Sequence, residues 1–352
     1  MPITFRLFPA NLRRTLARTA TLLAACAAGQ AAHAATTLVI NSMMPPSDFV
    51  VTHVIKPWAA DVARVTQGRV VVSIPPASVV PPNQLWLAVT GDVVDGAYLF
   101  NGLIPSQLPL EQIAGLPFVA GSAAATTLAY WNTYQTYFAK AGDFRNVKLL
   151  ALFTEPAGEI FSFKRPIVKP ADFHGVRMWA LPGVPQRLLE GSGAGIEATP
   201  AVQIGQLVAA GTVDALAGVS GFVLDAQKAM PYVKFETRIT GGITAPAFSL
   251  IVNKAKWESI APADRKAIEA ISGANFASRL AALDRFNRAI RARAVKHGLK
   301  VLEASPALEA DLHRRGQSMF TQWLAVAKSK GVDGNAALKY FEAEAQAQAH
   351  AQ

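Results

Sequence analysis

Two distant stretches of this sequence repeat one pattern. The first is GDVVDGAYL, Gly91–Leu99, and the second is AGTVDALAG, Ala210–Gly218. Each combines a glycine that can end a helix with Val-Asp, a small residue and a short apolar run typical of a buried strand. Two copies of one turn-and-strand unit predict two lobes of similar plan. The alternative is that Gly-x-Val-Asp is simply a common connection between a helix and a strand.

The segments around these stretches alternate between strand and helix patterns. Thr37–Ile40 and Arg69–Ile74 are predicted strands, and the chain between them has helical spacing. Such alternation is typical of an α/β fold with a largely parallel sheet and helices on both faces. Ala245–Lys254 predicts a strand that returns to the first lobe, and Phe276–Gly298 predicts an amphipathic helix long enough to lie across both lobes.

Size and charge limit the kinds of protein that fit. With 352 residues, of which 51% are hydrophobic, the chain can bury a large core and is long enough for two domains. The formal net charge is +10, but four arginines lie within residues 1–34, which contain no acid. The remaining charges are spread thinly, without the clustered Lys, Arg and aromatic residues of a nucleic-acid surface. No nucleic-acid partner is therefore expected.

The N-terminus has the layout of a secretory signal peptide. Arginines at residues 6–18 precede the apolar run TATLLAACAA and the small residues Ala32-His33-Ala34. This order predicts export, with cleavage after Ala34. The sequence Leu23–Cys26 also resembles a lipobox, so acylation at Cys26 is the alternative. Because Cys26 is the only cysteine, the exported chain is expected to contain no disulfide.

One short stretch concentrates side chains suited to binding. The segment Val176–Ala180 follows a Pro-Ala-Asp turn and stops at Pro182-Gly183. Alternation along a strand places Arg177 and Trp179 on the same face. A strand with a cation and an indole on one face, ending at a Pro-Gly break, can deliver both to the mouth of a cleft.

Motifs for catalysis are absent from the sequence. The histidines are scattered without His-Glu-x-x-His spacing, and no Gly-x-Ser-x-Gly elbow or P-loop is found. We therefore expect neither an enzyme nor a cofactor or metal site. An exported enzyme acting on a small molecule remains the alternative, and a purely structural or adhesive protein is a further one.

The order of several segments resembles the TRAP-type periplasmic solute receptors of the DctP family over nearly the whole chain after residue 34. The matching segments are TQGRVVVSI, PPASVVPPNQ, DVVDGAYLFNGLIPSQLPL, QIAGLPFV, VKLLALF, KRPIVKPADFHGVRMWALPG, AAGTVDAL and SLIVNKAKWESIAPADRKAI. The resemblance implies a two-lobe periplasmic-binding-protein-like fold with hinge strands and a long helix that spans both lobes. It also implies a receptor that captures a small organic solute between the lobes and delivers it to a TRAP membrane permease.

The chain departs from the family where the solute is usually held. The family strand after the Asp-x-x-Gly turn usually ends in an arginine that binds the solute carboxylate through two hydrogen bonds. Counting from Asp172, that position is Trp179 here, although a one-residue slip assigns it to Arg177. A second polar family position falls near Glu159. An indole with a nearby carboxylate favours a cationic or neutral solute that bears a ring or many hydroxyls, so a simple dicarboxylate is not expected.

Other expected solute contacts follow from the same resemblance and from the ends of the predicted strands. They are Ser42 in the first loop, Phe100 and Asn101 after the first Val-Asp strand, and Gly218, Ser220 and Phe222 after the second.

The expected domain organisation has four parts: a signal peptide at 1–34, lobe 1 at 35–152 and 243–285, lobe 2 at 153–242, and C-terminal helices at 286–352 that pack on both lobes. The hinge is expected near 150–154 and 247–251. For a carrier of this kind we expect a monomer or a weak dimer.

Overall fold

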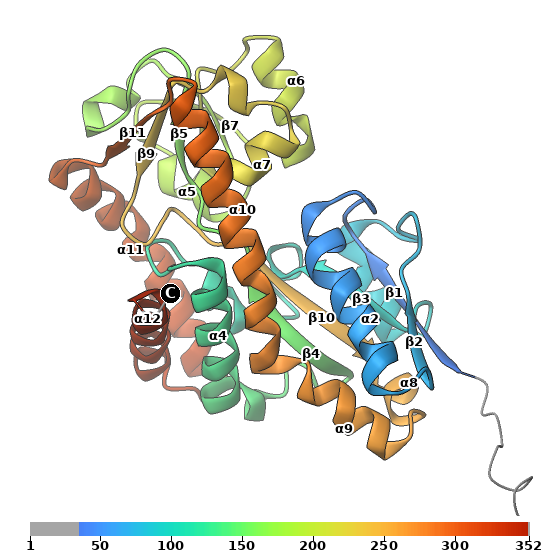
Figure 1. Ribbon diagram of the computed structural model, residues 1–352. Helices are drawn as coiled ribbons and strands as arrows, with labels where there is room; N and C mark the ends of the chain where they lie inside the picture. The colour runs from blue at the N-terminus through green and yellow to red at the C-terminus, as the bar shows by residue number, and fades with distance from the viewer. Residues whose placement is uncertain (1–34, 351–352) are drawn as a thin grey trace, which may run out of the picture.

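The protein consists of two lobes joined by crossing segments and a long helix, as Figure 1 shows for this computed structural model. The structure describes residues 35–350, with side chains described as far as Ala347. The predicted signal peptide and the lipobox at Cys26 lie outside the described residues. The α/β class and the two-lobe architecture predicted from the sequence are confirmed.

Lobe 1 is built on a five-stranded sheet with the order β2-β1-β3-β10-β4. Its strands are β1 Thr36–Ser42, β2 Val70–Ser73, β3 Gly96–Phe100, β4 Val147–Thr154 and β10 Ala247–Asn253. Its helices are a π-helical turn at Val51–Ile55, α2 Lys56–Val65, α3 Leu85–Thr90, α4 Ala123–Thr133, α8 Lys254–Glu258 and α9 Pro262–Ala270. The π-helical turn runs directly into α2, and Pro57 is the second residue of α2, so this proline does not break the helix.

Lobe 2 is built on a six-stranded sheet with the order β11-β9-β5-β8-β6-β7. Its strands are β5 Glu159–Ser162, β6 Arg177–Ala180, β7 Gly195–Glu197, β8 Ala215–Val219, β9 Phe235–Arg238 and β11 Lys300–Glu303. Its short helices are α5 Val184–Leu189, α6 Ile204–Ala209 and α7 Gly221–Ala226.

Both sheets are mixed, which corrects the prediction of largely parallel sheets. In lobe 1, β10 runs antiparallel to both of its neighbours, β3 and β4. In lobe 2, β5 runs antiparallel to β8 and β9. The reason is connectivity: β10 enters lobe 1 from lobe 2, and β5 enters lobe 2 from lobe 1. Each of these strands therefore starts at the hinge, whereas its neighbours end there, and so it runs antiparallel to them.

The hinge consists of two extended segments that hydrogen-bond to each other. Glu155 donates its backbone N–H to Pro246 over 3.0 Å, and Gly158 donates to Thr244 over 2.8 Å. The expected hinge strands, 150–154 and 247–251, are the ends of β4 and β10 nearest the hinge and pair within lobe 1. The crossing itself therefore lies one step further along, at 155–158 and 243–246.

Helix α10, Ala277–Lys296, crosses from lobe 1 to lobe 2, as Figure 1 shows in orange. Asp284 accepts hydrogen bonds from the first backbone N–H groups of α4 in lobe 1, over 2.8 and 3.0 Å. One turn later, the side-chain oxygen of Asn287 accepts the backbone N–H of Phe222 in α7 of lobe 2 over 3.0 Å. The long helix predicted from the sequence thus caps one helix in each lobe.

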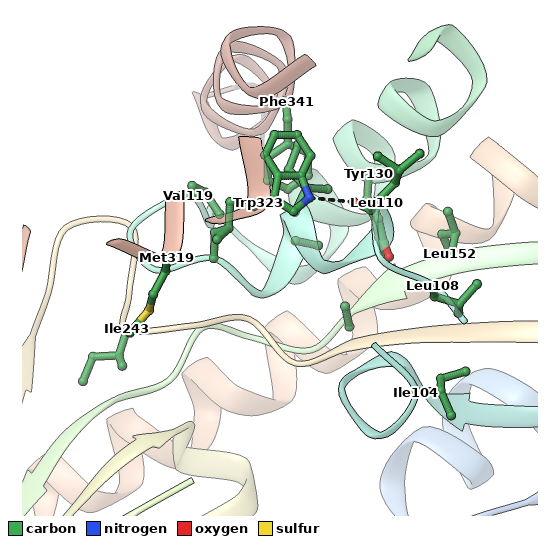
Figure 2. Packing of buried hydrophobic residues seen from close by; sticks show 14 of the residues in the cluster. Ile104, Leu108, Leu110, Val119, Tyr130, Leu152, Ile243, Met319, Trp323 and Phe341 are labelled. Carbon is green, nitrogen blue, oxygen red and sulfur yellow. Dashed lines mark hydrogen bonds between the residues drawn. The ribbon is translucent and has the colours of Figure 1, made fainter. Parts of the chain in front are cut away.

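The C-terminal region packs on both lobes but is not purely helical. Its helices are α11 Pro306–Ser329 and α12 Gly334–His350. Trp323 of α11 donates its indole N–H to the carbonyl of Leu110 over 3.1 Å, and Phe341 of α12 packs on Tyr130 of α4 (Figure 2). The expectation of helices alone over 286–352 is wrong at 300–303, because these residues form β11 beside β9.

Candidate functional site

The carboxyl ends of the parallel strands in both lobes meet at the hinge. Phe100, the last residue of β3, lies opposite Phe248 of β10, one step from the crossing segments. Val219, the last residue of β8, lies opposite Glu159, the first residue after the hinge. In open α/β sheets, ligands bind outside the carboxyl ends of the strands. The candidate site is therefore the region where these two edges face each other.

The lobe 1 side of this region is aromatic. The ring centroid of Phe248 lies 5.3 Å from those of Tyr98 and Phe100 and 5.5 Å from that of Phe153. Phe100 is partly exposed, whereas the other three rings are buried. Phe49, which follows the β1 loop, stacks on Phe286 of α10 with a centroid distance of 4.1 Å. Phe49 and Phe100 are the partly exposed rings of this group, and Phe100 packs on the buried ring of Phe248, so this edge of lobe 1 is apolar.

Two predicted contacts in lobe 1 have structural partners. The amide of Asn101 donates to the Tyr130 hydroxyl over 3.0 Å and accepts from the Ser249 hydroxyl over 2.7 Å. The Ser42 hydroxyl donates to the carbonyl of Met44 over 2.9 Å and shapes the loop after β1. Asn101 is buried and its amide makes both of these hydrogen bonds; whether it contacts a solute stays a prediction.

Trp179 lies inside lobe 2. Its side chain is 0% exposed, and its indole N–H donates to the hydroxyl of Thr199 over 3.0 Å. The ring belongs to the same hydrophobic cluster as Ile204 and Val208 of α6. Helices cover both faces of this part of the sheet, so neither face of β6 is open. The expectation that Trp179 offers a ring face to a solute is therefore corrected.

Arg177 is engaged elsewhere. Its guanidinium donates to both carboxylate oxygens of Asp214 over 2.8 and 2.9 Å, while 53% of its side chain remains exposed. Lys164 pairs with the same carboxylate over 2.8 Å. Arg177 and Lys164 lower the pKa of Asp214 well below its usual range. Since this ion pair lies at the amino ends of β6 and β8, away from the hinge, the expected role of Arg177 in holding the solute is also corrected.

The carboxyl end of β8 is shaped by close backbone packing. Gly158 of the hinge approaches Gly218 so closely that a Cβ on Gly158 would lie 2.2 Å from the Gly218 carbonyl carbon. Gly218 itself has a φ of +78°, which favours glycine. Ser220 is the N-cap residue of α7, and Phe222 in its first turn is buried. These residues lie at the hinge edge, where the sequence placed them; whether they contact a solute stays a prediction.

Glu159 is the one charged candidate that the structure places at the hinge edge. It is 6% exposed, and its Oε2 accepts the backbone N–H of Ile239 over 2.8 Å. Burial raises the pKa of Glu159 to about 8, and the nearby carboxylate of Glu236 adds to the shift. At neutral pH this side chain is therefore mostly an uncharged carboxylic acid.

Sequence reasoning missed two further polar groups at the hinge. Glu155 follows β4, two residues after Phe153, so the two side chains share a face. Burial raises the pKa of Glu155 well above its usual value, and Asp48 adds to the shift. The buried hydroxyl of Tyr98, whose pKa both carboxyls raise further, has no hydrogen-bond partner among the described residues. Asp48, whose side chain accepts the backbone N–H of Val51 over 3.1 Å, comes near Glu155 and Tyr98 only through the fold.

Across the described part of the chain, no group of three or more His, Cys, Asp or Glu side chains could hold a metal ion. Over the same residues, no helix has the length and apolar character needed to span a membrane.

The two-lobe arrangement agrees with the comparisons to known proteins. Residues 40–325 match the model of bacterial extracellular solute-binding proteins, family 7, known as DctP. The chain belongs to this family. DctP receptors of TRAP systems bind small organic solutes and work with a membrane permease, and the resemblance noted in the sequence is confirmed.

Individual relatives of this DctP protein cover almost all of it. The outer membrane transporter protein TsaT of Comamonas testosteroni is 38% identical over 96% of this chain and 99% of its own length. A TRAP periplasmic solute-binding protein of Bordetella bronchiseptica with bound (R)- and (S)-mandelate has a TM-score of 0.80 and 27% identity, covering 89% of this chain and 99% of its own. A TRAP protein of Rhodoferax ferrireducens in complex with benzoate has a TM-score of 0.75 and 25% identity, covering 90% and 99% of the two chains.

Proposed function

We propose that this DctP protein captures a small ring-bearing organic solute between its lobes and releases it unchanged to a TRAP permease. The observation that carries the proposal is Phe100, a partly exposed ring at the hinge edge of lobe 1, which is backed by the buried rings of Tyr98, Phe153 and Phe248. Aromatic rings pack favourably against other rings in offset or edge-to-face arrangements. The ligands of the Bordetella and Rhodoferax relatives, mandelate and benzoate, bear a ring and support the same class.

A simple dicarboxylate fits this edge poorly. Each carboxylate buried between the lobes needs a cation or a hydrogen-bond donor, so a dicarboxylate needs two such partners, because an unpaired buried charge is costly. Counting from Asp172, the family arginine falls at Trp179, which is buried, and the alternative position, Arg177, is bound to Asp214. The acids found at the hinge, Glu155 and Glu159, both have raised pKa values and supply no positive charge.

We further propose that the chain is exported with cleavage after Ala34 and acts in the periplasm as a monomer or weak dimer. The arginine-led apolar run and Ala32-His33-Ala34 support this. We also propose that the protein does not convert its solute chemically.

A thermal-shift panel tests the solute class. The panel pairs ring-bearing compounds (benzoate, mandelate, 3-hydroxybenzoate, benzyl alcohol, benzylamine) with succinate, malate and glucose. A ligand at one hundred times its Kd stabilises the native state by about 2.7 kcal/mol, which is a measurable shift. We expect the largest shifts from the ring-bearing compounds. The solute recovered afterwards should be chemically unchanged. A largest shift from succinate or malate would overturn the proposal.

A further inference from the structure

Glu159 has one satisfied oxygen and one free oxygen. Its Oε2 accepts the Ile239 N–H over 2.8 Å, while its Oε1 makes no hydrogen bond with any residue that the structure describes. The residue begins β5 directly after the hinge segment 155–158, opposite Val219 at the carboxyl end of β8. The free oxygen therefore belongs to a buried side chain at the edge where the lobes face each other.

The charged groups around Glu159 are already paired with other residues. Arg291 of α10 donates from Nε to both oxygens of Glu236 on β9 over 2.9 Å. Arg238, at the end of β9, forms an ion pair with Glu303 of β11 over 3.7 Å. These two arginines lower the pKa of Glu159 less than burial and Glu236 raise it. No cation among the described residues forms an ion pair with Glu159 itself.

The protonation state decides what this side chain can do. A buried carboxyl without a counterion keeps its proton, because the charged form loses its hydration. Since Oε2 already accepts from Ile239, the proton resides on Oε1. A neutral carboxylic acid is a hydrogen-bond donor, and its bond to an anionic oxygen is of the short, charge-assisted kind. Protonated Glu159 can therefore bind an anionic solute, whereas the sequence alone, which suggested a carboxylate here, favoured a cationic or neutral solute.

We propose that Glu159 is the hydrogen-bond donor that receives the carboxylate of an aromatic acid, in place of the arginine that usually does so in the family. The inference rests on the proposed function and names the solute class more closely: a ring that packs on the aromatic edge of lobe 1, with a carboxylate directed to Glu159 in lobe 2. Glu159 then contacts the solute from lobe 2, so closing the lobes completes the site.

Calorimetric titration of the whole exported protein with benzoate, from pH 6.5 to 9.5, tests this proposal. Benzoate stays ionised throughout, so a change in affinity reports on the protein. In the wild type, affinity should fall by about tenfold per pH unit once the pH exceeds the pKa of Glu159. In Glu159→Gln, whose amide can accept from Ile239 and still donate, affinity should stay within about threefold of the wild-type value at pH 6.5 over the whole range.

A matched control separates this effect from general alkaline damage. Glu111 is a second buried carboxyl with a pKa raised to about 8, but it lies against Asp143 in lobe 1, away from the hinge. Glu111→Gln should keep the wild-type dependence of benzoate affinity on pH. A flat wild-type profile, or the same fall in affinity in Glu159→Gln, would overturn the proposal.

Two further readouts keep the test decisive if Glu159→Gln does not fold. Titrating the wild type at pH 8 in two buffers of different ionisation enthalpy should show uptake of about half a proton per benzoate; no uptake, or release, would overturn the proposal. Benzyl alcohol, which has a ring but no carboxylate, distinguishes a failure of the Glu159 proposal from a failure of the proposed function. If it binds while benzoate does not at pH 6.5, the role of Glu159 fails and the ring-bearing class stands. If no ring-bearing compound binds, the proposed function itself fails.

Discussion

Asp95 and Asp214 occupy equivalent positions in the two lobes. Each directly precedes a strand, β3 or β8, and accepts the backbone N–H of the residue opposite it on the parallel neighbour. The donors are Val39 on β1, over 2.8 Å, and Arg177 on β6, over 3.3 Å. Each aspartate also pairs with a cation, Lys256 or Arg177. The repeated Val-Asp pattern in the sequence therefore marks a real structural repeat.

Because both lobes share this arrangement, we predict that the hydrogen bond accepted by Asp95 from Val39 contributes more to stability than the negative charge of Asp95. Asp95→Ala leaves the N–H of Val39 without its acceptor and should lower the free energy of unfolding by about 1–3 kcal/mol. Asp95→Asn keeps an acceptor oxygen and loses only the partly exposed ion pair with Lys256, so it should cost less than about 1 kcal/mol. Urea unfolding of both variants measures the difference. Equal losses would contradict the proposed role.

The burial of Trp179 predicts a loss of stability rather than of binding. Trp179→Ala removes a fully buried ring and should lower the free energy of unfolding by about 3–5 kcal/mol. Trp179→Phe keeps a ring but gives up the hydrogen bond to Thr199 and part of the packing inside lobe 2. Because neither lies at the hinge edge, its affinity for benzoate should stay within about threefold of wild type. Calorimetry on the phenylalanine variant is the check. If that variant is as stable as wild type but binds benzoate more than tenfold more weakly, the indole contacts the solute after all.

Glu111 predicts a pH dependence of stability in lobe 1. Both of its carboxylate oxygens are buried without a hydrogen-bond partner in the described chain, and burial raises its pKa to about 8. Because the folded state holds this proton at pH values where the unfolded state has lost it, stability falls as pH rises from about 4.3 to about 8.

The variant Glu111→Gln removes this contribution and should stabilise the protein by about 2–4 kcal/mol at pH 8.5 relative to wild type, with a smaller difference at pH 5. Urea unfolding at both pH values measures it. Glu258→Gln serves as the control, since that side chain is exposed on α8. A wild-type pH dependence in Glu111→Gln would show that this carboxyl is not the source of the slope.

The proposed processing site predicts the first residue of the exported protein. Cleavage after Ala34 gives a mature chain that starts at Ala35 and has no cysteine. Intact-mass measurement of protein from the periplasm determines the start. A lipid-modified N-terminus at Cys26 would instead establish the lipoprotein alternative.

The sequence was informative where local pattern and order along the chain decide the structure. Strand β10 was correctly placed in lobe 1 and α10 across both lobes. An apolar run bounded by turn residues indicates a buried strand, and a long amphipathic run indicates a long helix. Helix α12 follows the same rule, because Ala337, Phe341 and Ala345 lie at helical spacing and are all buried.

The site was harder to predict because partners distant in the sequence decide it. Alternation correctly groups Arg177 and Trp179, but it cannot tell that α6 covers that face of the sheet. Nothing near Arg177 in the sequence identifies Asp214 as its partner. Likewise, the charge of Glu159 follows from its burial and from its neighbours on β9 and α10, which only the fold brings together.

Small-angle X-ray scattering with and without a saturating ring-bearing solute tests the central claim most directly. If the two lobes close on the solute about segments 155–158 and 243–246, the radius of gyration should decrease on binding, as in other hinge-type receptors. Superimposable profiles with a solute that calorimetry shows to be bound would contradict capture by closure of the lobes.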